Sequence, residues 1–223
     1  MRKLSDIGFI GVDSLRSRAY LSCLRKAKLS PSLAIIIENS KPLSSFDKNE
    51  YFDVDTELRF YFKEEEYISL ETSDINSNLV VEALAKTKQQ YWIYSGPSGV
   101  IVKENILSLG KKLLHIHPGK VPGYRGSTTI YYSILMENEI YCSAFFLSSK
   151  IDAGDLIGRK EFKIFADKDR IDYIYDPFFR ASFLVDVISD YEKTGEFFIK
   201  KQTGNPRDFF IIHPVLKHLA ILR

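Results

Sequence analysis

The stretch "IGFIGVDSLRSRAYLSCLRKAKLSPSLAIII" (residues 7–37) decides the fold. Its first apolar run, Ile7–Val12, ends at Asp13, as a short buried strand does. Residues Arg16–Ala27 then carry apolar side chains at helical spacing, and Leu33–Ile37 is a second apolar, β-branched run after a Ser-Pro break at 30–31. This order of strand, helix and strand predicts an α/β fold with a parallel sheet.

The alternation of helices and strands continues along the chain. The expected elements are a helix at 79–88, a strand at 91–94, a helix at 104–109, and strands at 113–116, 141–147 and 157–165. Asp176-Pro177 predicts the start of a further helix, which Gly195 ends. We therefore expect one α/β body over residues 1–165 and a C-terminal helical appendage, 166–223, packed on the same domain.

Composition and charge exclude several classes of protein. Apolar residues make up 45% of the chain, near the globular average, which argues against disorder. The net charge is only +2 and no long Lys/Arg run occurs, so we expect no nucleic-acid partner. No stretch has the length of a membrane span, and Ile7–Val12 is too short for a signal peptide core. The two cysteines lack metal-type spacing, and we expect a cytoplasmic protein.

Two histidines stand at the end of the apolar run before Pro118. His115 and His117 are two residues apart, so in a strand they point to the same face, at the sheet edge where parallel sheets bind ligands. A metal pair would need further ligands from elsewhere in the chain. A pair of core histidines is the other alternative, and the surface-type loop that follows weakens it.

Two loops carry further polar groups. In "KVPGYRGSTT" (120–129), cations and hydroxyls precede a helix start, which suits an anion such as phosphate, although an ordinary capped loop is nearly as good an interpretation. In "KIDAGD" (150–155), Asp152 could orient a histidine or a water, or it could be a plain turn residue.

Taken together, "SGPSGVIVKENIL" (95–107), "LLHIHPGKVPGYRGSTT" (113–129) and "IDAGD" (151–155) resemble the formyltransferase family that uses 10-formyltetrahydrofolate. The resemblance covers roughly residues 7–165. It implies a Rossmann-like fold, with a mostly parallel central sheet and helices on both faces. It also implies an enzyme whose formyl donor is 10-formyltetrahydrofolate and which needs no metal.

The resemblance assigns roles to individual positions. His117 and Asp152 match the catalytic histidine and aspartate, His115 stands where the family has a catalytic asparagine, and Gly119 replaces the usual serine. The residues expected to contact the formyl donor are Gly96, Pro97, Ser98, Gly99, Val100, Ile101, Ser149 and Ile151. The residues expected to contact the acceptor are Arg16, Ser17, Lys120, Tyr124, Arg125 and Gly126.

Among members of that family, the chain looks most like the compact sugar N-formyltransferases, which act on nucleotide-linked amino sugars for surface polysaccharides. The charges of Arg16, Lys120 and Arg125 suit a nucleotide diphosphate. Two alternatives remain: a glycinamide ribonucleotide-type enzyme, or a folate or nucleotide-sugar binding protein altered by His115. Exposed aromatic residues in the C-terminal half are compatible with a homodimer.

Overall fold

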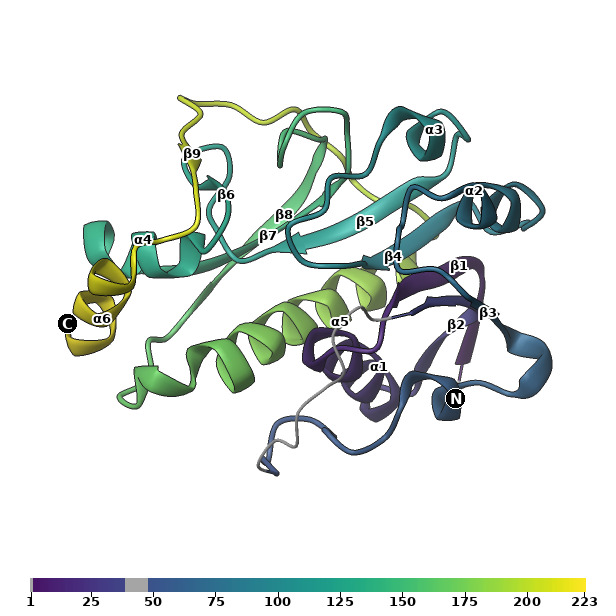
Figure 1. The fold of residues 1–223 in the computed structure, drawn as a ribbon, viewed down its shortest axis with the longest axis horizontal. Coiled ribbons are helices and arrows are strands. Elements are labelled where there is room, and N and C mark those ends of the chain that lie inside the picture. Colours follow the sequence, from purple (N-terminus) through teal and green to yellow (C-terminus); the bar gives the residue numbers. More distant parts are fainter. Residues whose placement is uncertain (1, 39–47) are drawn as a thin grey trace. The chain divides into compact units, whose positions relative to one another are not determined.

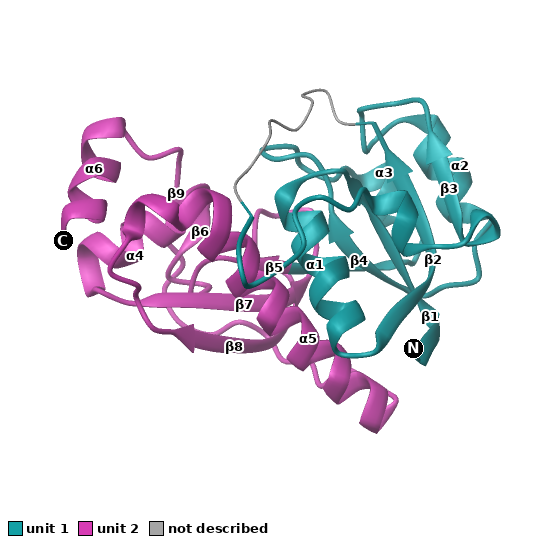
Figure 2. Cartoon of the chain, turned by 90° about the horizontal axis from the view of Figure 1, so that it is seen from below, with its two compact units in different colours: residues 1–115 teal, residues 116–223 magenta. Residues whose placement is uncertain are grey.

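The computed structural model describes residues 2–38 and 48–223. The chain divides into two compact units, residues 1–115 and 116–223 (Figure 2). We call them unit 1 and unit 2 and describe each by itself. This division is by compactness; the expected division by role, into 1–165 and 166–223, stays a prediction.

The strands of unit 1 form a parallel sheet in the order β3-β2-β1-β4-β5 (Figure 1). Their bounds are β1 Arg2–Val12, β2 Leu29–Ile37, β3 Tyr67–Leu70, β4 Tyr91–Ser95 and β5 Lys112–His117, whose last two residues belong to unit 2. The apolar runs of β1 and β2 are almost wholly buried, as strands of a parallel sheet covered on both faces are. The predicted parallel sheet is confirmed.

The helices of unit 1 connect these strands. Helix α1 (Leu15–Lys26) begins after Ser14, whose side chain accepts a hydrogen bond from the backbone N–H of Ser17. The crossovers from β1 to β2 and from β4 to β5 run in opposite directions across the sheet. Right-handed connections therefore place α1 on one face and α3 (Glu104–Leu107) on the other, where α2 (Asn78–Ala85) also lies (Figure 1). The predicted helices on both faces are confirmed.

Two expectations about strands were wrong. The Ser-Pro pair does not end an element, because β2 begins at Leu29 and includes Pro31. Pro31 is tolerated because the register of β1 against β2 shifts between Leu4 and Gly8, and prolines occur at such irregularities. Strand β3 was missed, since its residues are partly exposed and leave no apolar run in the sequence.

Unit 2 contains an antiparallel pair and a short parallel pair of strands. Strands β7 (Ile140–Phe146) and β8 (Leu156–Phe162) are antiparallel, and β6 (Arg125–Gly126) pairs in parallel with β9 (Asp208–Phe209). The helices are α4 (Thr129–Glu137), α5 (Asp176–Thr194) and α6 (Pro214–Leu222). Helix α5 packs against β7 and β8, so part of the expected appendage lies in the core of unit 2 (Figure 1).

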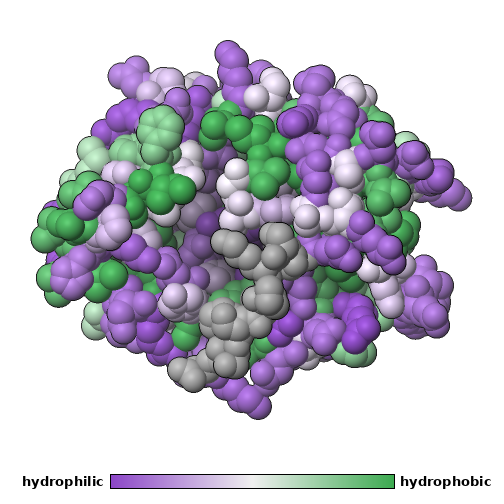
Figure 3. All heavy atoms as spheres, in the orientation of Figure 1, coloured by the Kyte–Doolittle hydropathy of each residue, from purple (hydrophilic) through white to green (hydrophobic). Residues whose placement is uncertain are grey.

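Apolar side chains are exposed near the C-terminus. Phe210 is 84% exposed, and Val215, Leu219 and Leu222 are exposed along α6. In Figure 3, green apolar atoms lie on the side where Figure 1 shows α6. A patch of this kind is compatible with the expected homodimer, which stays a prediction. Among the described residues, the helices are too short or too polar to span a bilayer.

Candidate active site

His117 is the last residue of β5, and its ring is held by acceptors on one side. The side chain is almost fully buried, and Nε2 lies 2.8 Å from the carbonyl oxygen of Tyr124. Nε2 also lies 3.2 Å from Oγ1 of Thr129, which donates its own proton to the carbonyl of Pro118 at 2.8 Å. Both neighbours of Nε2 are therefore acceptors, so Nε2 carries the proton and Nδ1 is the nitrogen left for chemistry.

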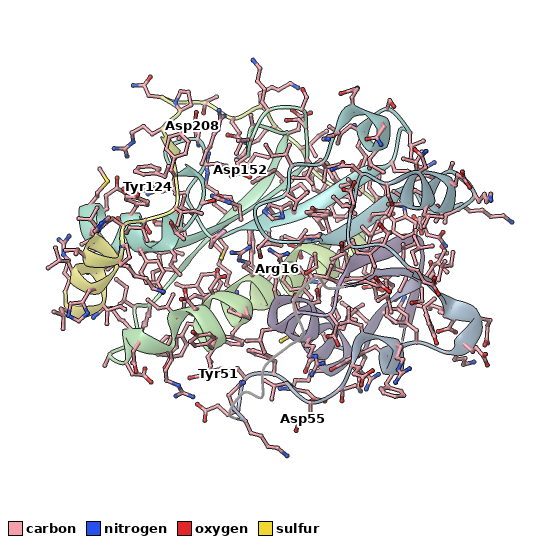
Figure 4. The ribbon with its side chains drawn as sticks, viewed as in Figure 1. Arg16, Tyr51, Asp55, Tyr124, Asp152 and Asp208 are labelled. Carbon is pink, nitrogen blue, oxygen red and sulfur yellow. The ribbon has the colours of Figure 1, made fainter. Side chains whose placement is uncertain are left out.

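Asp152 lies beside that nitrogen. One of its carboxylate oxygens, Oδ2, is 3.4 Å from Nδ1 of His117 and accepts a hydrogen bond from the backbone N–H of Gly126 at 2.7 Å. Asp152 itself has a left-handed backbone conformation, with φ of 47°, in the turn that follows β7 (Figure 4). The structure thus brings together the two side chains to which the sequence assigned catalysis, both within unit 2.

Burial makes the neutral form of the His117 imidazole the favoured one. Burial lowers the pKa of His117 below its ordinary value, while the Asp152 carboxylate opposes this and raises it. On α5, Arg180 lowers the pKa of His117 further and Asp176 raises it. A separation of 3.4 Å also exceeds the roughly 2.7–2.9 Å of a charge-assisted hydrogen bond. Nδ1 therefore presents a lone pair, and a proton taken up there would be stabilised by the carboxylate.

Three glycines allow this close packing. A Cβ on Gly119 would lie 2.8 Å from Nε2 of His117 and 2.7 Å from the Tyr124 carbonyl. Gly126 has φ of 96°, and a Cβ there would lie 2.1 Å from the carbonyl oxygen of Phe209. A Cβ on Gly154 would meet the carbonyl oxygen of Phe146 at 1.6 Å. In this chain a side chain at 119 would clash with the packing around the histidine.

The expected acceptor-binding side chains of unit 2 are already engaged. Lys120 lies 3.3 Å from a carboxylate oxygen of Glu139, and its Nζ lies 4.2 Å from the ring centre of Tyr141. Tyr124 is buried and stacks on Phe209 with ring centres 5.2 Å apart, and burial raises the pKa of its hydroxyl to about 12. Their assigned contacts with an acceptor stay predictions.

Arg125 and the loop after β7 complete the positions predicted in unit 2. The guanidinium of Arg125 donates to Oε1 of Gln202 at 2.7 Å, and Gly126 gives its N–H to Asp152. Ser149 and Ile151 are exposed in the loop after β7.

The predicted pterin loop lies in unit 1 and has an exposed middle. Its residues 98–101 are exposed, and Gly99 has φ of 75°. Arg16 holds one end, donating to Oγ of Ser95 and to the carbonyl of Gly96. Asn76 holds the other end, donating to the carbonyl of Ile101 at 3.0 Å and accepting from the N–H of Lys103 at 2.7 Å. The loop therefore presents exposed residues between two fixed ends, which suits recognition of a flat, polar ring.

Arg16 and Ser17 serve the structure of unit 1. Ser17 is fully buried, and its hydroxyl lies 2.7 Å from that of Ser95, while Arg16 lies on the first turn of α1 (Figure 4). Their expected contact with phosphate stays a prediction.

His115 lies two residues before His117 on β5, so both imidazoles point to the same face of the strand. Its ring is tilted against that of Tyr94, with centres 6.0 Å apart. The two histidines and Asp152 are also a set of residue types that can bind a metal ion, and catalytic zinc takes three protein ligands. The structure thus keeps the metal alternative open beside the formyl-transfer one.

Sequence comparison decides between families. Residues 9–180 match the formyl transferase family. The chain belongs to this family. A methionyl-tRNA formyltransferase of Finegoldia magna is 25% identical over 151 residues, which cover 66% of this chain and 47% of that protein. The chain of this formyl transferase family member thus spans about half the length of that curated relative.

Solved structures share the fold. The N-formyltransferase from Helicobacter canadensis, in complex with folinic acid and dTDP-3-aminofucose, is 19% identical, with a TM-score of 0.63 over 93% of this chain and 71% of that one. A sugar N-formyltransferase from Shewanella is 14% identical, with a TM-score of 0.61 over 98% and 87% of the two chains. At these identities the likeness shows a common fold.

Sequence reasoning missed residues that hold the site from a distance. Asn76 anchors the predicted pterin loop, and Gln202 contacts the Asp152 turn. Neither belongs to a motif, and each acts through a partner at least 25 residues away in the chain. The backbone N–H of Gly126, which binds Asp152, differs from these two residues because it lies in a segment that the sequence analysis had already identified, residues 120–129.

Proposed function

We propose that this chain transfers a formyl group from 10-formyltetrahydrofolate to the amine of a nucleotide-linked amino sugar. The observation that carries the proposal is the His117–Asp152 pair in a chain of the formyl transferase family. The buried imidazole has one nitrogen fixed by a backbone carbonyl and the other beside a carboxylate. This is the arrangement of a base whose protonated form is stabilised in place.

Each group has a role in the proposed reaction. The acceptor amine attacks the formyl carbon, a new C–N bond forms, and the carbonyl electron pair moves onto oxygen. Nδ1 of His117 takes a proton from the attached amine, and Asp152 stabilises the resulting imidazolium. The imidazolium then gives this proton to the folate nitrogen as the carbon–nitrogen bond to the folate breaks, which releases tetrahydrofolate and the formamide.

The negative oxygen of the tetrahedral intermediate needs a donor, and His115 is our candidate. An imidazole N–H can donate as the amide of the family's asparagine does, although with a different reach. Such donors are worth roughly 3–4 kcal/mol of barrier in enzymes where their loss has been measured.

The nature of both substrates is supported by the relatives and by the site. The Helicobacter canadensis enzyme was solved with a folate compound and a dTDP-linked amino sugar. In this chain, the exposed backbone of residues 98–101 suits the pterin ring. Lys120 and Arg125 flank the catalytic loop, and their positive charges suit the two phosphates of a nucleotide diphosphate. A cytoplasmic location, where folate is used, fits this proposal.

The proposal is tested by incubating the protein with 10-formyltetrahydrofolate and a panel of nucleotide-linked amino sugars. We expect tetrahydrofolate release and a mass gain of one carbonyl on one acceptor. The His117→Asn variant should be inactive, whereas His218→Asn, which changes an exposed histidine on α6, should not affect turnover. Absence of transfer to every acceptor, or activity that chelators abolish and zinc restores, would refute the proposal.

A further inference from the structure

The segment after α5 runs back along the loops that carry the catalytic groups. The backbone of Lys200 exchanges two hydrogen bonds with that of Leu156, at 2.8 and 2.9 Å. Further on, the N–H of Arg207 donates to the carbonyl of Pro122, and β9 pairs with β6. This return segment, residues 200–209, therefore contacts both the turn of Asp152 and the strand of Gly126, which binds the Asp152 carboxylate (Figures 1 and 4).

The side chain of Gln202 bridges two loops of the site. Its Nε2 donates to the carbonyl of Asp152 at 2.8 Å and to that of Gly154 at 2.9 Å. Its Oε1 accepts from the guanidinium of Arg125 at 2.7 Å. All these contacts lie within unit 2.

The chemistry of the partners fixes the orientation of this amide. The two carbonyls can only accept and the guanidinium can only donate, so a flipped amide would lose every contact. The Gln202 side chain thus connects the carbonyl of Asp152, which has left-handed φ, to the guanidinium of Arg125, the residue before Gly126.

We propose that Gln202 is a positioning residue for the formyl-transfer site, because its amide fixes the Asp152 turn against the Arg125–Gly126 strand. This inference rests on the proposed function for its kinetic readout. Near-attack geometry tolerates little error: a misplacement of about 1 Å can cost on the order of 100-fold in rate. The wild-type amide limits this freedom through its contacts with Asp152, Gly154 and Arg125.

Two variants separate the contacts. Gln202→Leu loses all of them, whereas Gln202→Glu keeps an oxygen for Arg125 but turns a second oxygen toward the two carbonyls. We expect both to lower kcat by roughly 10- to 100-fold, with KM for both substrates within about threefold of wild type. Lys201→Gln, which removes only an exposed ion pair with Asp155, is the matched control and should keep wild-type kcat. Wild-type kcat in Gln202→Glu would overturn the inference, since the Arg125 contact alone would then suffice.

A second readout needs no turnover. Asp152 raises the pKa of His117, against the effects of burial and Arg180 and together with Asp176. If the turn moves away in Gln202→Leu, the pKa of His117 measured by NMR should fall, while Lys201→Gln should leave it unchanged. An unchanged His117 titration in a folded Gln202→Leu protein would overturn the inference. If wild type transferred no formyl group, this titration would still decide it, so the two failures are distinguishable.

Discussion

Replacing Asp152 with Asn should remove most of the turnover while leaving the fold intact. Asparagine adopts left-handed φ readily, as position 152 requires, and its carbonyl oxygen can still accept from Gly126. The oxygen that accepts from Gly126 is also the atom nearest Nδ1 of His117, so a neutral amide oxygen would then face the imidazole. The imidazole keeps its geometry but loses the negative charge that stabilises its protonated form.

The size of the loss follows from the distance. Two unit charges 3.4 Å apart interact by about 5 kcal/mol at an effective dielectric constant near 20. Both side chains are largely buried, so solvent screens this interaction little. Since about 1.4 kcal/mol is a factor of ten, the ceiling is roughly 3,000-fold. The amide oxygen is a dipole that still attracts the imidazolium in part, so we expect a loss of about 1,000-fold in kcat.

The assay is the initial rate of tetrahydrofolate release at saturating donor and acceptor, with the melting temperature of each variant measured alongside. Asp155→Asn is the matched control, because Asp155 lies in the same loop and its described side-chain contact is with exposed Lys201. It should keep wild-type turnover. An Asp152→Asn variant that turns over within a few-fold of wild type would refute the role of the carboxylate.

Three further outcomes are expected. Gly119→Ser should lower kcat at least tenfold, because its Cβ would crowd Nε2 of His117, whereas Gly123→Ser, whose Cβ would meet nothing within 3.4 Å, should not. NMR titration should place the pKa of His117 below its ordinary 6.5, so the imidazole is neutral above that pH and the base form is lost as pH falls; a value above 6.5 would contradict this. Asn76→Ala removes the hydrogen-bond partner of the Ile101 carbonyl and the Lys103 N–H at one end of the predicted pterin loop. It should raise KM for the formyl donor by about tenfold with little change in kcat, measured by donor titration.

The fold was predictable because its signals are local, whereas the catalytic roles of His117 and Asp152 came from the family resemblance and stay predictions. Each buried strand of unit 1 leaves an apolar run, and the connection between runs decides that the sheet is parallel. The end of an apolar run predicted that His117 lies at the carboxyl end of a strand, as it does at the end of β5. The Asp-x-Gly motif predicted a turn at Asp152, and the structure places its carboxylate beside His117. Strand β3 and the strands β6 and β9 left no such signal, since short, partly exposed strands show neither period nor hydrophobicity.

The orientation of the catalytic pair depends on contacts that no local pattern contains. The tautomer of His117 follows from the carbonyl of Tyr124, and the carboxylate of Asp152 is bound by an amide 26 residues earlier in the chain. The residue that carries this amide, Gly126, packs directly on the return segment: a Cβ there would lie 2.1 Å from the carbonyl oxygen of Phe209. The return segment thus contacts both halves of this hydrogen bond. Through β9 it pairs with the strand of Gly126, which donates to the carboxylate, and through Gln202 it binds the turn of Asp152. Changes in Gln202 or in β9 should therefore lower turnover, although these residues lie far from the motifs in the sequence.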